Sequence, residues 1–184
     1  MAKHRYPEYI YHYTNFLNFI SIYDDQTIKP SCSNLLPCDK DSLQYKQVSC
    51  RGHKIGVEPF DNNSVYKPVV WFTSNPNISD INREVCALPS HKTDVRLSVK
   101  FDKEKFISWK KFADSNKMDP DWRYSVERGM QHKNFYVYEG SLPYSDIVEI
   151  KIIKEYQPIY DKLLNGDNLD NFIKSYAVNY NIIR

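Results

Sequence analysis

The sequence is poor in glycine, with five in 184 residues, at positions 52, 56, 129, 140 and 166. No spacing among them satisfies G-x-G-x-x-G or G-x-x-x-x-G-K-[ST], the loops whose backbone holds a dinucleotide or a triphosphate. Rossmann dehydrogenases, P-loop NTPases and protein kinases are therefore excluded. The chain also lacks G-x-S-x-G, H-E-x-x-H and an EF-hand loop, which removes several common hydrolase and metal-binding classes.

Long apolar runs are absent as well. The N-terminal stretch MAKHRYPEY has no apolar signal-peptide core, and no run approaches the roughly 20 residues that cross a bilayer. The net charge is only 25 − 23 = +2, so no strong field attracts nucleic acid or an anionic membrane. We expect a soluble, cytoplasmic protein with no membrane partner.

Cysteine is scarce and unevenly placed, at positions 32, 38, 50 and 86, so reduced thiols are expected. Cys32, Cys38, Cys50 and His53 form C-x5-C-x11-C-x2-H, a conceivable zinc set. Structural zinc sites usually pair their ligands at two- to four-residue spacing, which only Cys50 and His53 satisfy. Unrelated small apolar cysteines are the better explanation of the pattern, and we expect no metal.

Residues 9–13 alternate as an extended strand does, with His12 and Thr14 on one face and the tyrosines on the other. Thr14 or Asn15 then caps a helix whose apolar residues recur every three or four positions up to the polar DDQT. His12 therefore lies close to a strand-to-helix junction.

Further strands are predicted at 28–30, 68–76, 94–101, 134–139 and 146–153, and helices at 102–116 and near 121–129, with one or two more around Gly166. This mixture lacks regular βαβ alternation. It predicts an α+β fold, a single domain over 1–184 with a split, largely antiparallel β-sheet flanked by helices. Residues 31–67 form a long irregular insertion. In strand 94–101, Arg96 and Lys100 fit a charged solvent face, the commoner case, or a phosphate contact.

Two H-x-T triplets occur, His12-Tyr13-Thr14 and His91-Lys92-Thr93. Paired H-x-T motifs are the signature of two-histidine (2H) phosphoesterases, in which two imidazoles act as acid and base beside a phosphate. Cleavage of cyclic or linear oligonucleotides is therefore one alternative function.

Three segments carry the leading hypothesis: IYHYTNFLNFISI, KPVVWFTSNP and NFYVYEGSLPYSDIVEI. Their order, a histidine strand leading into a helix, a central strand ending in aromatic and hydroxyl residues, and a later glutamate, resembles the ADP-ribosyltransferase superfamily in its H-Y-E-like branch. The first two also resemble a group of uncharacterised bacterial and phage proteins with H-Y-T and V-W-F-S-S-N-P motifs. The likeness covers about half the chain.

The resemblance implies an ADP-ribosyltransferase-like fold that binds NAD+ as co-substrate in a cleft across the split sheet, with no metal. His12 would match the residue that binds the adenosine ribose, with Tyr13 and Thr14 beside it. The second motif, where an aromatic ring packs on nicotinamide and hydroxyls support the site, is occupied by Trp71, Phe72, Thr73 and Ser74.

The family's glutamate holds the nicotinamide ribose and favours the cation formed when nicotinamide leaves. Relatives often place it at the start of the strand that here begins at Asn134, whereas this chain has Glu139 at that strand's end and Glu127 upstream. Glu139 shares a strand face with Phe135 and Val137 and is the first candidate. Glu127 is the second.

We therefore expect an NAD+-dependent ADP-ribosyltransferase that modifies a protein or a nucleic acid, as the resemblance implies. The likeness to phage and bacterial proteins suggests a conflict factor. Besides the phosphoesterase, a second alternative is a non-catalytic module that binds a partner protein through its tyrosine-rich surface.

Overall fold

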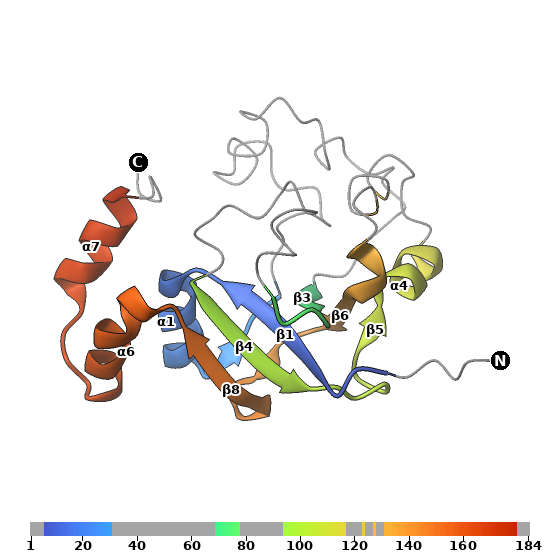
Figure 1. Ribbon diagram of the computed structural model, residues 1–184, viewed down its shortest axis with the longest axis horizontal. Coiled ribbons are helices and arrows are strands. Elements are labelled where there is room, and N and C mark those ends of the chain that lie inside the picture. Colours follow the sequence, from blue (N-terminus) through green and yellow to red (C-terminus); the bar gives the residue numbers. More distant parts are fainter. Residues whose placement is uncertain are drawn as a thin grey trace.

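The computed structural model describes residues 6–30, 69–77, 94–116, 123, 127 and 131–179 (Figure 1). Six strands form one sheet in the order β5-β6-β3-β1-β4-β8. They are β1 Tyr9–Thr14, β3 Val69–Thr73, β4 Val95–Lys100, β5 Ile107–Ser108, β6 Phe135–Glu139 and β8 Ile147–Ile152. A second sheet pairs β2 Thr27–Ile28 with β7 Leu142–Pro143.

The helices are α1 Phe16–Asp25, α4 Trp109–Ser115, α6 Gln157–Leu164 and α7 Asp170–Asn179, with short 3-10 helices at Gln131–Asn134, Tyr144–Asp146 and Lys154–Tyr156. Every strand pairing is antiparallel, which confirms the α+β prediction. The predicted insertion at 31–67 lies outside the described residues. Within the described ranges, no helix combines the length and the apolar character needed to cross a membrane.

The large sheet is split between β1 and β3. Strand β1 pairs with β4 over six residues, from Tyr9↔Lys100 to Thr14↔Val95, but it pairs with β3 only at Tyr11↔Thr73. Two three-stranded halves, β1-β4-β8 and β3-β6-β5, therefore meet through one backbone pair. The predicted split sheet is confirmed.

Alternation along β1 defines two faces of the sheet. Ile10, His12 and Thr14 lie on what we call the histidine face, and Tyr9, Tyr11 and Tyr13 lie on the tyrosine face. The larger core packs α1, α6 and α7 against the histidine face, around residues such as Phe72 and Leu97. A smaller core packs α4 on the other face, against Val69 and Val137. Figure 1 shows α1, α6 and α7 at one end of the sheet and α4 at the other.

The junction of β1 and α1 is fixed by a local cap. Asn15 has an extended backbone, and its side-chain oxygen accepts a hydrogen bond from the Asn18 N–H at 2.7 Å. This satisfies one of the helix-start donors that lack a partner within the helix. The helix ends at Gln26, whose backbone is left-handed (φ 53°) and whose N–H donates to the Ile22 carbonyl.

The helix predicted over 102–116 is wrong in its first half. Asp102 instead closes a turn, accepting the Glu104 N–H on its side chain and the Phe106 N–H on its carbonyl, both at 2.9 Å. Ile107 and Ser108 then extend to form β5 on the edge of the sheet, where Ile107 pairs with Val137. Strand pairing with a residue 30 positions away overrides the helical periodicity, and α4 begins only at Trp109.

A buried carboxylate connects the C-terminal helix to this junction. Asp94, 4 % exposed, precedes β4, and its Oδ2 accepts hydrogen bonds from the Phe16 N–H at 3.2 Å and from the Tyr176 hydroxyl of α7. Its backbone carbonyl accepts the Ile153 N–H after β8. Asp94 therefore holds α1, α7 and the end of β8 together, and a negative charge at the start of α1 suits the helix dipole.

We expect Tyr176→Phe to lower the free energy of unfolding by about 1.5–3 kcal/mol, because it removes a hydrogen bond to a buried charged group. Urea denaturation measures this, with an unchanged m-value showing that the cooperative unit is intact. Tyr160→Phe on α6 is the matched control, since no hydrogen bond is described for that hydroxyl, and it should cost less than about 0.5 kcal/mol. Equal losses in the two variants would contradict the role given to Asp94.

Candidate active site at the split of the sheet

His12 directly contacts the second predicted motif across the split. Its Nδ1 lies 2.9 Å from the carbonyl oxygen of Trp71, 59 residues away in the sequence. Its ring centroid lies 5.7 Å from that of Phe72. The imidazole therefore bridges β1 and β3 beyond the end of their backbone ladder. The first and second motifs, which are far apart in the sequence, are in contact here.

This contact fixes the state of the His12 ring. A backbone carbonyl only accepts hydrogen bonds, so Nδ1 must carry the proton. In the neutral ring, Nε2 is then the nitrogen with the lone pair. The half-buried ring is therefore held in one orientation by its bond to Trp71.

The side chains of the second motif divide between the two faces of β3. Phe72 is buried on the histidine face, whereas Trp71 stacks on Trp109 of α4 with ring centroids 5.0 Å apart on the other face. Thr73 is buried, and its Oγ1 accepts the Asn75 N–H at 3.1 Å. Ser74 follows the strand, and its N–H donates to the Asn134 carbonyl at 2.8 Å. The hydroxyl of Thr73 thus shapes the turn that ends the motif.

Thr14 and Tyr13 end β1 on opposite faces. Thr14 is 4 % exposed on the histidine face. Tyr13 faces the other way, where its hydroxyl donates to the Asn75 carbonyl at 3.3 Å. Burial raises the pKa of Tyr13 to about 12, although the nearby Arg96 acts in the opposite direction. Tyr13 is therefore neutral at physiological pH and links β1 to the end of the second motif.

Glu139 ends β6 and is exposed. Its register partner on β3 is Val69. Alternation along β6 puts Glu139 on the same face as Phe135 and Val137, as predicted. Since Thr73 pairs with both Phe135 and Tyr11, this is the tyrosine face, opposite the His12 side chain. Strands β1 and β6 both run antiparallel to β3, so His12 and Glu139 still lie toward the same end of the sheet.

Glu127 is hydrogen-bonded to Trp109, the residue on which Trp71 stacks. Its Oε1 accepts hydrogen bonds from the indole N–H of Trp109 at 3.2 Å and from Arg123 Nε at 2.7 Å. Trp109 is fully buried, so the carboxylate satisfies a buried donor and holds the ring on which Trp71 stacks. The structure therefore places both candidate glutamates on the Trp71 side of the sheet.

Other sequence candidates fall outside the described residues. His91 and Thr93 of the second H-x-T triplet do so, as do Cys32, Cys38, Cys50 and His53 of the possible zinc set. Among the residues that are described, no group of three or more histidine, cysteine, aspartate or glutamate side chains is arranged to hold a metal ion.

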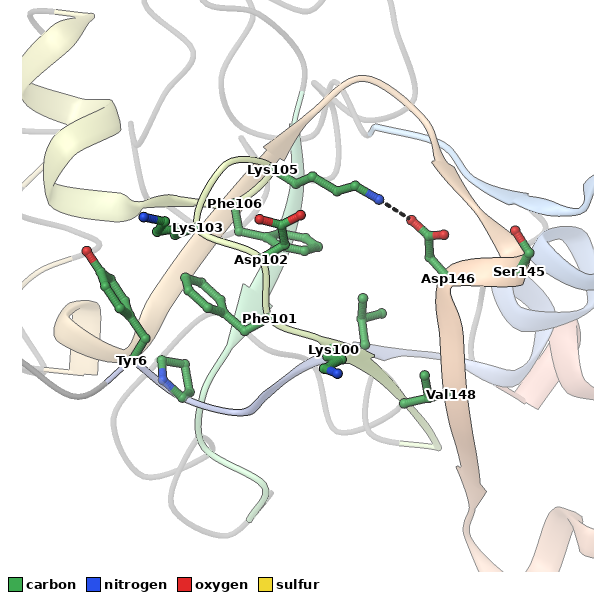
Figure 2. Close-up of a pocket in the computed structure, with 12 residues that line it drawn as sticks. Tyr6, Lys100, Phe101, Asp102, Lys103, Lys105, Phe106, Ser145, Asp146 and Val148 are labelled. Atoms are coloured by element: carbon green, nitrogen blue, oxygen red, sulfur yellow. Dashed lines mark hydrogen bonds and ion pairs between the residues drawn. The ribbon is translucent and has the colours of Figure 1, made fainter.

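A pocket of about 610 Å³ lies away from the predicted site residues, between the turn that follows β4, the approach to β1 and the start of β8 (Figure 2). Tyr6 stacks on Phe101 at its wall, with ring centroids 5.4 Å apart. Lys105 pairs with Asp146 at 3.2 Å across it. None of the predicted catalytic or cofactor-binding residues lines this pocket.

Sequence reasoning missed Asp94 as a support of the site. Its partners Phe16 and Tyr176 are 78 and 82 residues away, and a lone aspartate before a strand resembles an ordinary turn residue. No local signal distinguishes it. The helix cap, by contrast, was predicted at Thr14 or Asn15, and Asn15 is the residue that caps, with a partner three residues away.

Comparison with known proteins gives limited information. No protein family model matches the chain, and no curated protein matches it. Among solved structures, the chain is similar to Thermus sp. 2.9 DarT in complex with ADP-ribosylated ssDNA, with 15% sequence identity over 86% of this chain and 87% of that chain and a TM-score of 0.43. A likeness at this TM-score supports no residue-by-residue or functional assignment.

We expect His12→Asn to be more stable than His12→Ala by about 1 kcal/mol, because the asparagine amide keeps a donor near the position of Nδ1 and so satisfies the Trp71 carbonyl. Paired urea denaturation curves measure the difference. Long-range ¹H–¹⁵N spectra of the wild type should show the Nδ1-protonated tautomer at neutral pH. An Nε2-protonated ring with a bare Nδ1 would refute the bridge to Trp71.

The raised pKa of Tyr13 predicts a pH dependence. The unfolded tyrosine ionises near pH 10 and the folded one at about 12, so above pH 10 the unfolded state releases a proton that the folded state retains. The stability contribution of Tyr13 is therefore complete below pH 10 and is lost as the pH rises toward 12. Tyr13→Phe should lose less stability than the wild type between pH 9.5 and 11.5 in urea denaturation. Parallel losses would show that Tyr13 ionises normally.

Proposed function

We propose that the protein is an NAD+-dependent ADP-ribosyltransferase that transfers ADP-ribose to a protein or nucleic-acid acceptor. The observation that carries the proposal is the His12–Trp71 contact at the split of the sheet. It joins two of the three segments on which the resemblance rests, at the point where β1 and β3 separate and where that family binds its dinucleotide.

The residues at the split suit a dinucleotide. The proposal gives His12 the adenosine ribose, since a ring whose Nδ1 is committed to a carbonyl has Nε2 as its acceptor. The second motif supplies aromatic surface for nicotinamide, with Trp71 held by its stacking on Trp109. Because adjacent residues of β1 and β3 point to opposite faces, His12 and Trp71 lie on opposite faces at the split, and the ligand we propose contacts residues of both.

The transfer requires the bond between C1′ of the ribose and nicotinamide to break, with nicotinamide leaving with the bonding electrons. The acceptor nucleophile then forms a bond to C1′ and gives up its proton. The intermediate stage resembles an oxocarbenium ion, so a carboxylate that holds the ribose 2′-hydroxyl and a negative charge near C1′ both lower the barrier. We assign this role to Glu139.

Glu127 is the second candidate for the carboxylate. Its Oε1 already accepts from both Trp109 and Arg123, and such a carboxylate is better suited to positioning Trp71 than to holding a ribose. Loss of Glu127 would therefore act through Trp109 and Trp71, and it would lower stability as well as activity.

The test is incubation of the purified chain with labelled NAD+ and a cell lysate, followed by separate nuclease and protease digestion of the labelled material. We expect label in macromolecules, reduced by about 10²-fold or more in Glu139→Gln and strongly reduced in His12→Ala. Glu104→Gln, an exposed glutamate paired only with Lys103 among its described contacts, is the matched control and should retain activity.

Two other outcomes would replace the proposal. Cleavage of cyclic or linear oligonucleotides that is lost in both His12→Ala and His91→Ala would identify the 2H phosphoesterase instead. Label transfer that persists in Glu139→Gln and Glu127→Gln would remove both carboxylates from the chemistry. Absence of labelling and of cleavage would favour the non-catalytic protein-binding module.

A further inference from the structure

Arg96 is the most constrained cation on the tyrosine face. Its guanidinium carbon lies 4.9 Å from the centroid of the Tyr11 ring, NH1 donates to the Pro76 carbonyl at 3.2 Å and NH2 donates to Glu149 Oε2 at 2.8 Å. The side chain is only 15 % exposed. Contacts from three segments therefore fix the plane of this guanidinium, which is unusual for a charge on the polar face of a strand.

One donor of this group is left without a partner. Arg96 Nε is buried, and among the described residues it has no hydrogen-bond partner. A buried donor of a charged group that bonds neither protein nor water is destabilising, and such groups call for a specific explanation. Because Nε is buried, an anion would meet the guanidinium at its terminal nitrogens. NH1 and NH2 each donate one described hydrogen bond and each carry a second N–H, and the planar fork of arginine donors suits phosphate.

Arg96 also lies beside the proposed active site. It pairs with Tyr13 across β1 and β4, and its contact with Pro76 places it at the end of the second motif, whose Asn75 carbonyl accepts the Tyr13 hydroxyl. The group that must be neutralised in a dinucleotide is the diphosphate between its two riboses. A residue that binds the diphosphate is therefore expected close to the residues that hold the riboses.

We propose that Arg96 forms an anion subsite on the tyrosine face and that its ligand is the diphosphate of the dinucleotide. This inference rests on the proposed function for the identity of the dinucleotide, although the phosphate contact itself is tested without any transfer reaction. Glu149 orients the guanidinium and offsets part of its charge. Arg96 is thus a binding residue whose affinity for phosphate is held down by its own ion pair.

The experiment is titration calorimetry of the full chain with adenosine, AMP, ADP and ADP-ribose. The wild type should bind ADP at least about tenfold more tightly than adenosine, and Arg96→Gln should remove this difference while leaving adenosine affinity unchanged. Lys100→Gln is the matched control, because Lys100 is a cation on the same strand and face, four residues along, and exposed. It should retain the difference.

Glu149→Gln tests the same inference with the arginine intact. Removing the competing carboxylate should tighten ADP binding several-fold without changing adenosine affinity, an effect that a purely structural Arg96–Glu149 pair would not produce. The ADP affinity of Glu149→Gln therefore tests the anion subsite even if Arg96→Gln does not fold. Equal affinity of the wild type for adenosine and ADP, absence of binding, or an unchanged difference in folded Arg96→Gln would each overturn the subsite.

The two proposals fail differently. A chain that binds ADP through Arg96 but transfers no label from NAD+ keeps the subsite and loses the transferase. Label transfer in which Arg96→Gln leaves the KM for NAD+ unchanged keeps the transferase and overturns the subsite.

Discussion

One backbone pair, Tyr11 with Thr73, joins the two halves of the large sheet, and the rest of the candidate site depends on how the halves are held beyond it. Past this pair the ladder ends, and the Trp71 carbonyl is satisfied by the His12 imidazole instead of by a backbone N–H of β1. A side chain therefore replaces a backbone rung. This satisfies a backbone acceptor and still leaves β1 and β3 apart, which a continuous ladder would not allow.

A split maintained by so few bonds needs rigid flanks. On the β1 side, Asn15 caps α1, and buried Asp94 bonds both the Phe16 N–H and the Tyr176 hydroxyl. On the β3 side, Trp71 stacks on Trp109, whose indole N–H bonds Glu127. Each half is thus fixed by its own core and its own buried polar bond. The position of His12 relative to Trp71 then follows from two rigid bodies, as a precise ligand site requires.

Local signals in the sequence were sufficient for part of this arrangement. Alternation placed His12 and Thr14 on one face, and a cap at Thr14 or Asn15 marked the start of α1, because the residues involved lie within four positions of each other. The predicted helix over 102–116 began too early, because Ile107 instead pairs in a strand with Val137, 30 residues away. The face that Glu139 shares with Val137 followed from alternation. The register of β1, β3 and β6 decides that this face is opposite His12. A shift of one residue in that register would put Glu139 on the face of His12, and no local signal in the sequence sets the register.

That register also determines how one ligand can use all the candidate residues. No single strand presents adjacent residues to the same side, so His12 and Tyr13 necessarily serve different faces. The polar groups on the tyrosine face, Arg96 among them, line up next to the Tyr13–Asn75 contact, while the histidine face behind His12 is filled by the apolar core of α1. Among the described residues of β1 and β4, the cations that could face an anionic group, Arg96 and Lys100, lie on the tyrosine face. The proposed dinucleotide would therefore have its charged middle beside β4, on the face that carries Arg96.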